Sequence, residues 1–119
     1  MSTFTVPATL IHPERRDRSL VIDLVVDTGA TYTLLPAEVV AQLELPTPYE
    51  RPAELASGER IIYRVGEVRI GLAGEERVTV FFAGPPGSRA LLGAVTLEQF
   101  GLAADPVHRR LFPVPGLLV

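Results

Sequence analysis

The fold is decided by the stretch Val21-Ile22-Asp23-Leu24-Val25-Val26-Asp27-Thr28-Gly29-Ala30-Thr31. Aliphatic residues dominate residues 20–26, which predicts a strand with one buried face. Asp23 falls on the other face, so we expect it at the surface. The run ends on a carboxylate, a hydroxyl and a glycine at residues 27–29, a combination typical of a tight turn. Asp27 is therefore the candidate functional acid.

Each residue of this turn has a use in acid-base chemistry. An Asp carboxylate can take a proton from water or, when protonated, give one to a carbonyl oxygen. Two carboxylates about 3 Å apart repel by roughly 5 kcal/mol at an effective dielectric of about 20, so such a pair retains one shared proton over several pH units. The Thr28 hydroxyl can lock the turn, and Gly29 lets the backbone approach a reacting water. A carboxylate pair of this kind can hydrolyse a peptide bond without a metal ion.

A second short motif, Ala90-Leu91-Leu92-Gly93, lies later in the chain. It precedes residues 94–100, which predict a short helix capped by Gly101. Together with Asp27-Thr28-Gly29-Ala30, it resembles the retropepsin-like aspartic proteases, in particular the bacterial single-domain members. The resemblance extends over roughly residues 3–113. It implies an all-β, retropepsin-like closed barrel of short strands with one short helix near the C-terminus, assembled as a two-fold homodimer.

The resemblance also implies an activity, that of an aspartic endopeptidase. Two copies of Asp27 would activate a water and protonate the scissile carbonyl in turn. Ala30 and Leu92 would line the substrate pocket, although Leu92 can equally be an ordinary core residue. Gly93 would allow two chain segments to cross closely. The catalytic residues implied in this way are Asp27, Thr28 and Gly29.

The chain carries one copy of the acid motif, because none of its other aspartates precedes Thr-Gly. Its 119 residues suit a single domain, residues 1–119, with one modest core. A mechanism with two carboxylates therefore needs a second subunit, related to the first by a two-fold axis. The sequence predicts a homodimer that acts on an extended peptide or protein substrate.

Residues 53–65 predict a β-hairpin with Ser57 and Gly58 at its tip. Because this hairpin lies between the two motifs, the resemblance makes it the flap that closes over the substrate. Ser57 and Gly58 would then contact the substrate backbone. A plain surface hairpin is the alternative, and we expect Tyr63 to be an ordinary half-buried strand residue.

The remaining elements are predicted from apolar alternation and turn residues. Pro36 predicts the start of a short helical segment that extends to about Leu43. Three prolines, Pro46, Pro48 and Pro52, predict an irregular surface connection. Elsewhere we expect a first strand at 3–11, with Pro7 at an edge or a bulge, a polar turn at 12–19, paired strands at 66–72 and 77–82, and a last hairpin at 102–112.

Composition limits the function further. The net charge of −3 and the pI near 5.3 give no reason to expect nucleic-acid binding. The chain has no cysteine, and His12 and His108 are isolated loop residues that we expect at the surface, so no metal and no cofactor are predicted. No long apolar run or leader-like segment is evident. We expect a cytoplasmic protein that does not bind membranes.

Two departures from the retroviral members bear on dimer contacts. Those proteins pair an acid after the first motif with an arginine after the second, whereas Thr31 and Ala94 occupy these positions here. Loss of both partners leaves no unpaired charge, so the fold is still expected. Two other functions remain open: a dimeric peptide-binding or regulatory module with weak or no catalysis, and a small-molecule hydrolase with a carboxylate pair on an unrelated β fold.

Overall fold

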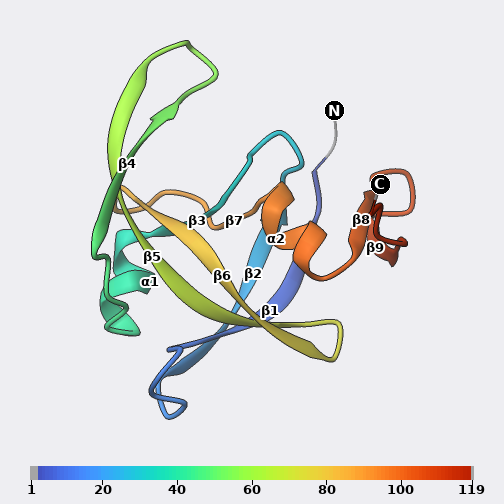
Figure 1. The fold of residues 1–119 in the computed structure, drawn as a ribbon, viewed down its shortest axis with the longest axis horizontal. Coiled ribbons are helices and arrows are strands. Elements are labelled where there is room, and N and C mark those ends of the chain that lie inside the picture. The colour runs from blue at the N-terminus through green and yellow to red at the C-terminus, as the bar shows by residue number, and fades with distance from the viewer. Residues whose placement is uncertain (1–2, 119) are drawn as a thin grey trace.

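The computed structural model of the chain describes residues 3–118. Its elements are β1 Thr5–Ile11, β2 Ser19–Val26, β3 Thr33–Pro36, α1 Ala37–Gln42, β4 Tyr49–Glu54, β5 Arg60–Leu72, β6 Glu75–Gly84, β7 Leu91–Leu92, α2 Ala94–Gln99, β8 Leu102–Asp105 and β9 Arg110–Pro113. Most of the regular secondary structure is β-strand (Figure 1), which agrees with the predicted all-β class. The fold class was expected to contain one short helix, near the C-terminus. The structure has a second, α1, at the segment that Pro36 predicted.

The main sheet has the strand order β1-β2-β7-β3-β6-β5-β4. In addition, β5 pairs with β1 at Thr9–Ile11, so the strands from β1 to β5 in this order form a continuous circuit of pairing. Of the strands in this sheet, β4 lies outside the circuit, because it pairs with β5 alone. Pro7 lies in the part of β1 that pairs with β2 alone, where its missing N–H costs no ladder hydrogen bond. The predicted edge position of Pro7 is therefore confirmed.

The core fills the space inside this circuit of strands. On β2, Leu24 and Val26 are buried and Asp23 is exposed, as the alternation predicted, but Val25, on the same face as Asp23, is also buried. A strand whose alternate side chains are apolar buries that face and leaves the other to water. The fully buried hydrophobic side chains come from several strands and from the residue that follows α1, and include Leu10, Leu24, Leu35, Leu43, Val68, Ile70, Phe81 and Leu92.

The β4–β5 hairpin stands away from the body of the protein (Figure 1). Its tip spans residues 55–59, where Leu55 N–H donates to Glu59 O at 2.8 Å and Gly58 adopts a φ of +88°. The predicted hairpin with Ser57 and Gly58 at the tip is thus confirmed. The prediction of an irregular connection through Pro52 is wrong, because β4 contains this residue. As an edge strand, β4 tolerates a residue without an N–H.

The C-terminal part forms a separate two-stranded sheet of β8 and β9. Gly101 ends α2 with a φ of +66°, which confirms its predicted capping role. In the β8–β9 turn, Asp105 accepts N–H bonds from Val107 and His108 and contacts the His108 ring at 2.7 Å. The His108 ring, helped by these N–H groups, holds the pKa of the Asp105 carboxyl below its usual value. Near the C-terminus, Leu117 and Leu118 are 93% and 96% exposed in the single chain.

Candidate active site

The Asp27 turn follows directly from β2. Asp27 N–H donates to Leu92 O on β7 at 3.1 Å, which extends the parallel β2–β7 pairing by one bond. The Asp27 carboxylate is half-buried, and its Oδ1 accepts the Gly29 N–H at 3.0 Å. Ala30 N–H closes the turn by donating to Asp27 O at 3.1 Å. These bonds fix the orientation of the carboxylate while Thr28 stays exposed.

The second sequence motif lies against this turn, as the pairing of the two motifs implied. Ala94 N–H donates to Ala30 O at 2.8 Å, and Val95 N–H donates to Thr31 O at 2.9 Å. The carbonyl groups of the acid turn therefore satisfy backbone donors at the start of α2. Backbone hydrogen bonds hold the two loops together at the positions where retroviral members use an ion pair.

Gly93 lies where two chain segments cross closely. A Cβ on Gly93 would be 2.4 Å from Tyr32 C and 2.5 Å from Tyr32 O, both backbone atoms. A side chain therefore cannot fit without displacing the Tyr32 backbone. The close crossing implied for Gly93 is present in the structure.

A buried chain of hydroxyl groups supports the acid turn from behind. Thr96 Oγ1 lies 2.7 Å from Thr33 Oγ1 and 2.8 Å from Thr79 Oγ1, and Gly93 N–H donates to Thr33 Oγ1 at 3.2 Å. All three threonines are at most 2% exposed. Sequence reasoning missed this network, because its members come from α2, β3 and β6 and have no common spacing.

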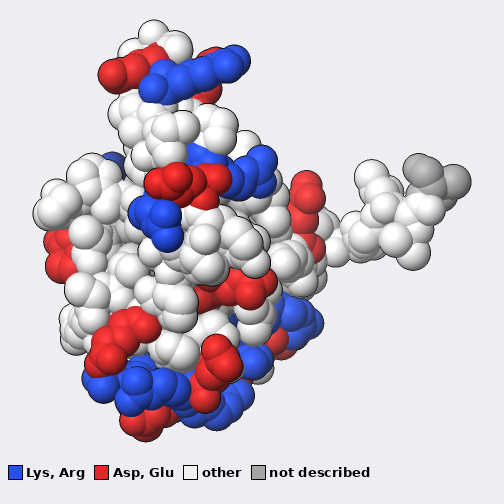
Figure 2. Space-filling model, turned by 60° about the vertical axis from the view of Figure 1, so that its left-hand side comes forward, with Lys and Arg blue, Asp and Glu red and all other residues white. Residues whose placement is uncertain are grey.

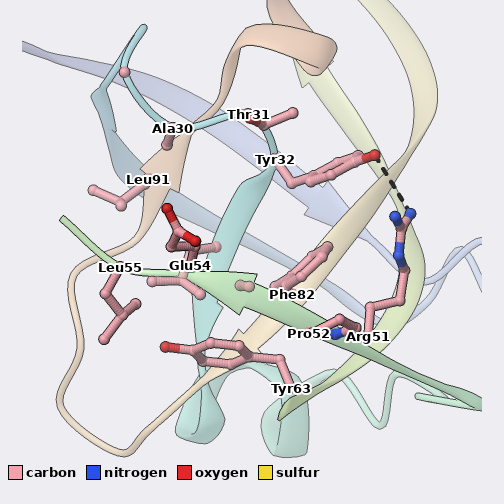
Figure 3. A pocket seen from close by; sticks show the side chains of 13 residues that line it. Ala30, Thr31, Tyr32, Arg51, Pro52, Glu54, Leu55, Tyr63, Phe82 and Leu91 are labelled. Atoms are coloured by element: carbon pink, nitrogen blue, oxygen red, sulfur yellow. Dashed lines mark hydrogen bonds between the residues drawn. The ribbon is translucent and has the colours of Figure 1, made fainter. Parts of the chain in front are cut away.

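A cavity of about 400 Å³ opens between the acid turn and the β4–β5 hairpin (Figure 3). The acid turn contributes residues 29–32, and the hairpin contributes residues 51–55 together with Tyr63. Leu34, Phe82 and Leu91 complete an apolar lining. This cavity can accept a side chain of a molecule that lies along the cleft.

One wall of the cavity is aromatic. The rings of Tyr32 and Phe82 are stacked with their centroids 5.0 Å apart, and Tyr63 is tilted against Phe82 at 6.0 Å. The Arg51 guanidinium lies 5.6 Å from the centroid of the Tyr32 ring and donates to Tyr32 Oη at 3.4 Å. Sequence reasoning did not place Tyr32, Arg51 or Phe82 at the site, because only the folded hairpin brings them together.

The predicted substrate-binding residues divide into two groups. Ala30 lines the cavity. Leu92 is fully buried in the core, and its neighbour Leu91 lines the cavity instead, because adjacent residues of a strand point to opposite sides. Ser57 and Gly58 are exposed at the hairpin tip and are not part of the cavity lining.

The two histidines have different surroundings. His12 was expected at the surface, but it is 6% exposed, and its Nδ1 accepts the N–H groups of Glu14 and Arg15, both at 3.1 Å. It therefore stabilises the β1–β2 turn. His108 is exposed, as predicted. Across residues 3–118, no three His, Cys, Asp or Glu side chains gather closely enough to hold a metal ion.

Neither helix of the described part of the chain is long and apolar enough to span a membrane. Acidic and basic side chains are intermixed on the face drawn in Figure 2, including the raised hairpin.

Comparison with known proteins identifies the family. The sequence model of the family described as gag-polyprotein putative aspartyl protease matches residues 19–99. The matched range is more than half of the chain and includes the Asp27 turn, the β4–β5 hairpin and the motif that ends at Gly93. No curated protein matches the chain. The chain therefore belongs to this family of aspartyl proteases, and it is a retropepsin-like aspartic protease by sequence and by its β-rich fold.

Proposed function

We propose that this protein is an aspartic endopeptidase that works as a two-fold homodimer with one Asp27 from each subunit at the site. The observation that carries the proposal is the Asp27 turn itself, which fixes one half-buried carboxylate directly before Gly29 and Ala30, two residues that line an open, largely apolar cavity. Asp27 itself is not one of the lining residues. Glu54 is the acid among the lining residues, and it forms an ion pair with Arg60 at 3.3 Å. A second reactive carboxylate must therefore come from another chain.

The reaction follows from a carboxylate pair that shares one proton. The ionised Asp27 removes a proton from a water molecule as the water oxygen attacks the peptide carbonyl carbon. The protonated Asp27 of the partner subunit gives its proton to the carbonyl oxygen, which forms a neutral tetrahedral diol. When the diol collapses, the C–N bond breaks and the nitrogen takes up a proton from a carboxyl group. The diol returns one hydroxyl proton as the acid product forms, so the pair again holds one proton.

Several other residues have roles in the proposal. The Gly29 N–H bond to Asp27 Oδ1 would keep the carboxylate in the plane that the pair needs. The Thr28 hydroxyl, exposed in the single chain, would bond across the two-fold axis. Ser57 and Gly58 would contact the substrate backbone when the flap closes. Gly58 adopts a positive φ, which glycine does without strain, so it suits a tip that has to bend.

The substrate would be an extended peptide that adds as a strand beside the flap and the Gly29 carbonyl. Its side chains would enter the cavity lined by Ala30 and Leu91. The closed form of the barrel belongs to this proposal and is supported by the β1–β5 pairing. The cytoplasmic location and the extent of the domain over residues 1–119 stay predictions.

The test is cleavage of a mixed peptide library by the wild type and by Asp27→Asn over a pH range of about 4 to 8. Analytical ultracentrifugation in the same buffers records the oligomeric state. The proposal expects a wild-type dimer that cuts and an Asp27→Asn dimer that does not. If both proteins are folded dimers and neither cuts, the peptide-binding module replaces the protease as the better account.

A further inference from the structure

Over residues 49–65, where β4 pairs with β5, the hairpin carries three arginines, and one of them differs from the other two. Arg64 pairs with Glu50 at 3.5 Å and Arg60 pairs with Glu54 at 3.3 Å, each directly across the ribbon. These pairs share one face, since their positions have the same parity. Arg51 lies opposite Tyr63 on the other face. Within residues 3–118 it forms no ion pair with a carboxylate.

The Arg51 guanidinium is held in place without an anion. It lies over the Tyr32 ring at 5.6 Å from the centroid, a cation–π arrangement, and the ring is fixed by stacking on Phe82. Arg51 Nη1 donates to Tyr32 Oη at 3.4 Å, as the dashed line in Figure 3 marks. Because the phenol oxygen accepts this bond, its own hydrogen is free to donate elsewhere. A positive charge and a second donor thus meet at one end of the cavity.

The rest of the cavity suits the stem of a long side chain. Leu34, Phe82 and Leu91 form an apolar lining between the acid turn and the Arg51 end. Glu54 also lines the cavity, but Arg60 offsets its charge. A purely apolar side chain could fill this space, but it would make no hydrogen bond to the guanidinium or to the Tyr32 hydroxyl, and a basic side chain would be repelled by the guanidinium.

We propose that Arg51 and Tyr32 bind the carboxylate of a substrate glutamate side chain, so that the cavity selects an acidic residue close to the scissile bond. The apolar lining would hold the glutamate methylene groups, and Arg51 with the Tyr32 hydroxyl would donate to its carboxylate. Glutamate is favoured over aspartate because its longer stem reaches across the lining. This inference rests on the proposed protease function and specifies its substrate class.

The test compares cleavable peptides that differ only by Gln or Glu, with each position near the scissile bond changed in turn. We expect kcat/KM to be about five- to ten-fold higher for Glu at one position, a modest ratio because Arg51 is exposed. Arg51→Met should abolish the ratio and Arg51→Lys should reduce it. Arg64→Met, a matched control on the opposite face, should leave the ratio unchanged. Raising the salt concentration should lower the ratio.

A second measurement separates this inference from the proposed function. The same peptides, fluorescently labelled, are titrated with Asp27→Asn and binding is followed by anisotropy. If the wild type cuts Gln and Glu peptides equally well, the acidic preference is overturned while the protease function stands. If nothing is cut but Glu peptides still bind more tightly through Arg51, the protease function fails and the acidic site stands. If Arg51→Met dissociates the dimer and leaves the peptide ratio intact, Arg51 pairs with the partner subunit and the inference is overturned.

Discussion

The threonine network offers a sharp test of how the acid turn is supported. In Thr96→Val, a methyl group replaces the hydroxyl that joins Thr33 and Thr79, with little change in side-chain shape. The Thr33 hydroxyl keeps the Gly93 N–H as a donor, but the Thr79 hydroxyl loses the side-chain bond that it makes to Thr96. The substitution therefore leaves buried hydroxyl groups unsatisfied.

The expected cost follows from the burial of these groups. Thr33 and Thr79 are 0% and 2% exposed, so water cannot replace the lost bonds. An unsatisfied buried hydroxyl costs about 1–3 kcal/mol, so we expect Thr96→Val to lower the free energy of unfolding by about 2–3 kcal/mol. At roughly 4 °C per kcal/mol for a chain of this size, the melting temperature should fall by about 10 °C.

The assay is urea and thermal unfolding at one fixed protein concentration, because dimer formation makes stability depend on concentration. Thr79→Val/Thr96→Val removes both ends of one bond, so the double variant should be at least about 1 kcal/mol more stable than the sum of the single effects predicts. Strictly additive effects, or a loss below about 0.5 kcal/mol for Thr96→Val, would refute the network as a support of the fold.

Two further predictions concern neighbouring positions. Gly93→Ala forces a Cβ to within 2.5 Å of the Tyr32 backbone, so thermal unfolding should show that the free energy of unfolding falls by about 3 kcal/mol. Gly116→Ala is the control and should leave the stability unchanged, because no atom lies within 4 Å of the added Cβ. Equal melting temperatures of the two variants would contradict this prediction. Leu92→Ala truncates a core residue and should lower the free energy of unfolding by about 2–5 kcal/mol. Leu91→Ala should lower it less and should mainly change which peptides are cleaved. The reverse pattern in unfolding and cleavage assays would show that the roles of the two leucines are exchanged.

The elements that neighbouring residues specify, through apolar alternation or through glycine at turns, could be predicted from the sequence. Alternation along residues 20–26 defined β2 and its faces, and Gly58 and Gly101 marked a hairpin tip and a helix end through the positive φ that each adopts. Pro46 and Pro48 lie in the predicted irregular connection, but Pro52 misled because a proline disrupts a strand only where its N–H would be needed. Pro52 lies on the edge strand β4, and that position depends on tertiary structure.

The site was predictable only in part, because some of its residues are brought together by contacts between distant parts of the chain. The Asp27 turn and the Gly93 crossing follow from short motifs, but two adjacent leucines give no local sign of which faces the cavity. Parity is fixed by the pairing of β7 with β2, which brings Leu92 into the core. Arg51 meets Tyr32 through the bend of the hairpin over the acid turn, a long-range contact without a sequence pattern.

The central claim is that two subunits share one pair of Asp27 carboxylates, and mixed dimers test it most directly. Wild type is mixed with an equal amount of Asp27→Asn, the subunits are allowed to exchange, and peptide cleavage is compared with that of the same amount of wild type alone. Random pairing leaves about half of the wild-type chains in wild-type dimers, so activity should fall to about half. Full retention of activity after verified exchange would mean that one Asp27 is enough, and it would contradict the shared-carboxylate mechanism.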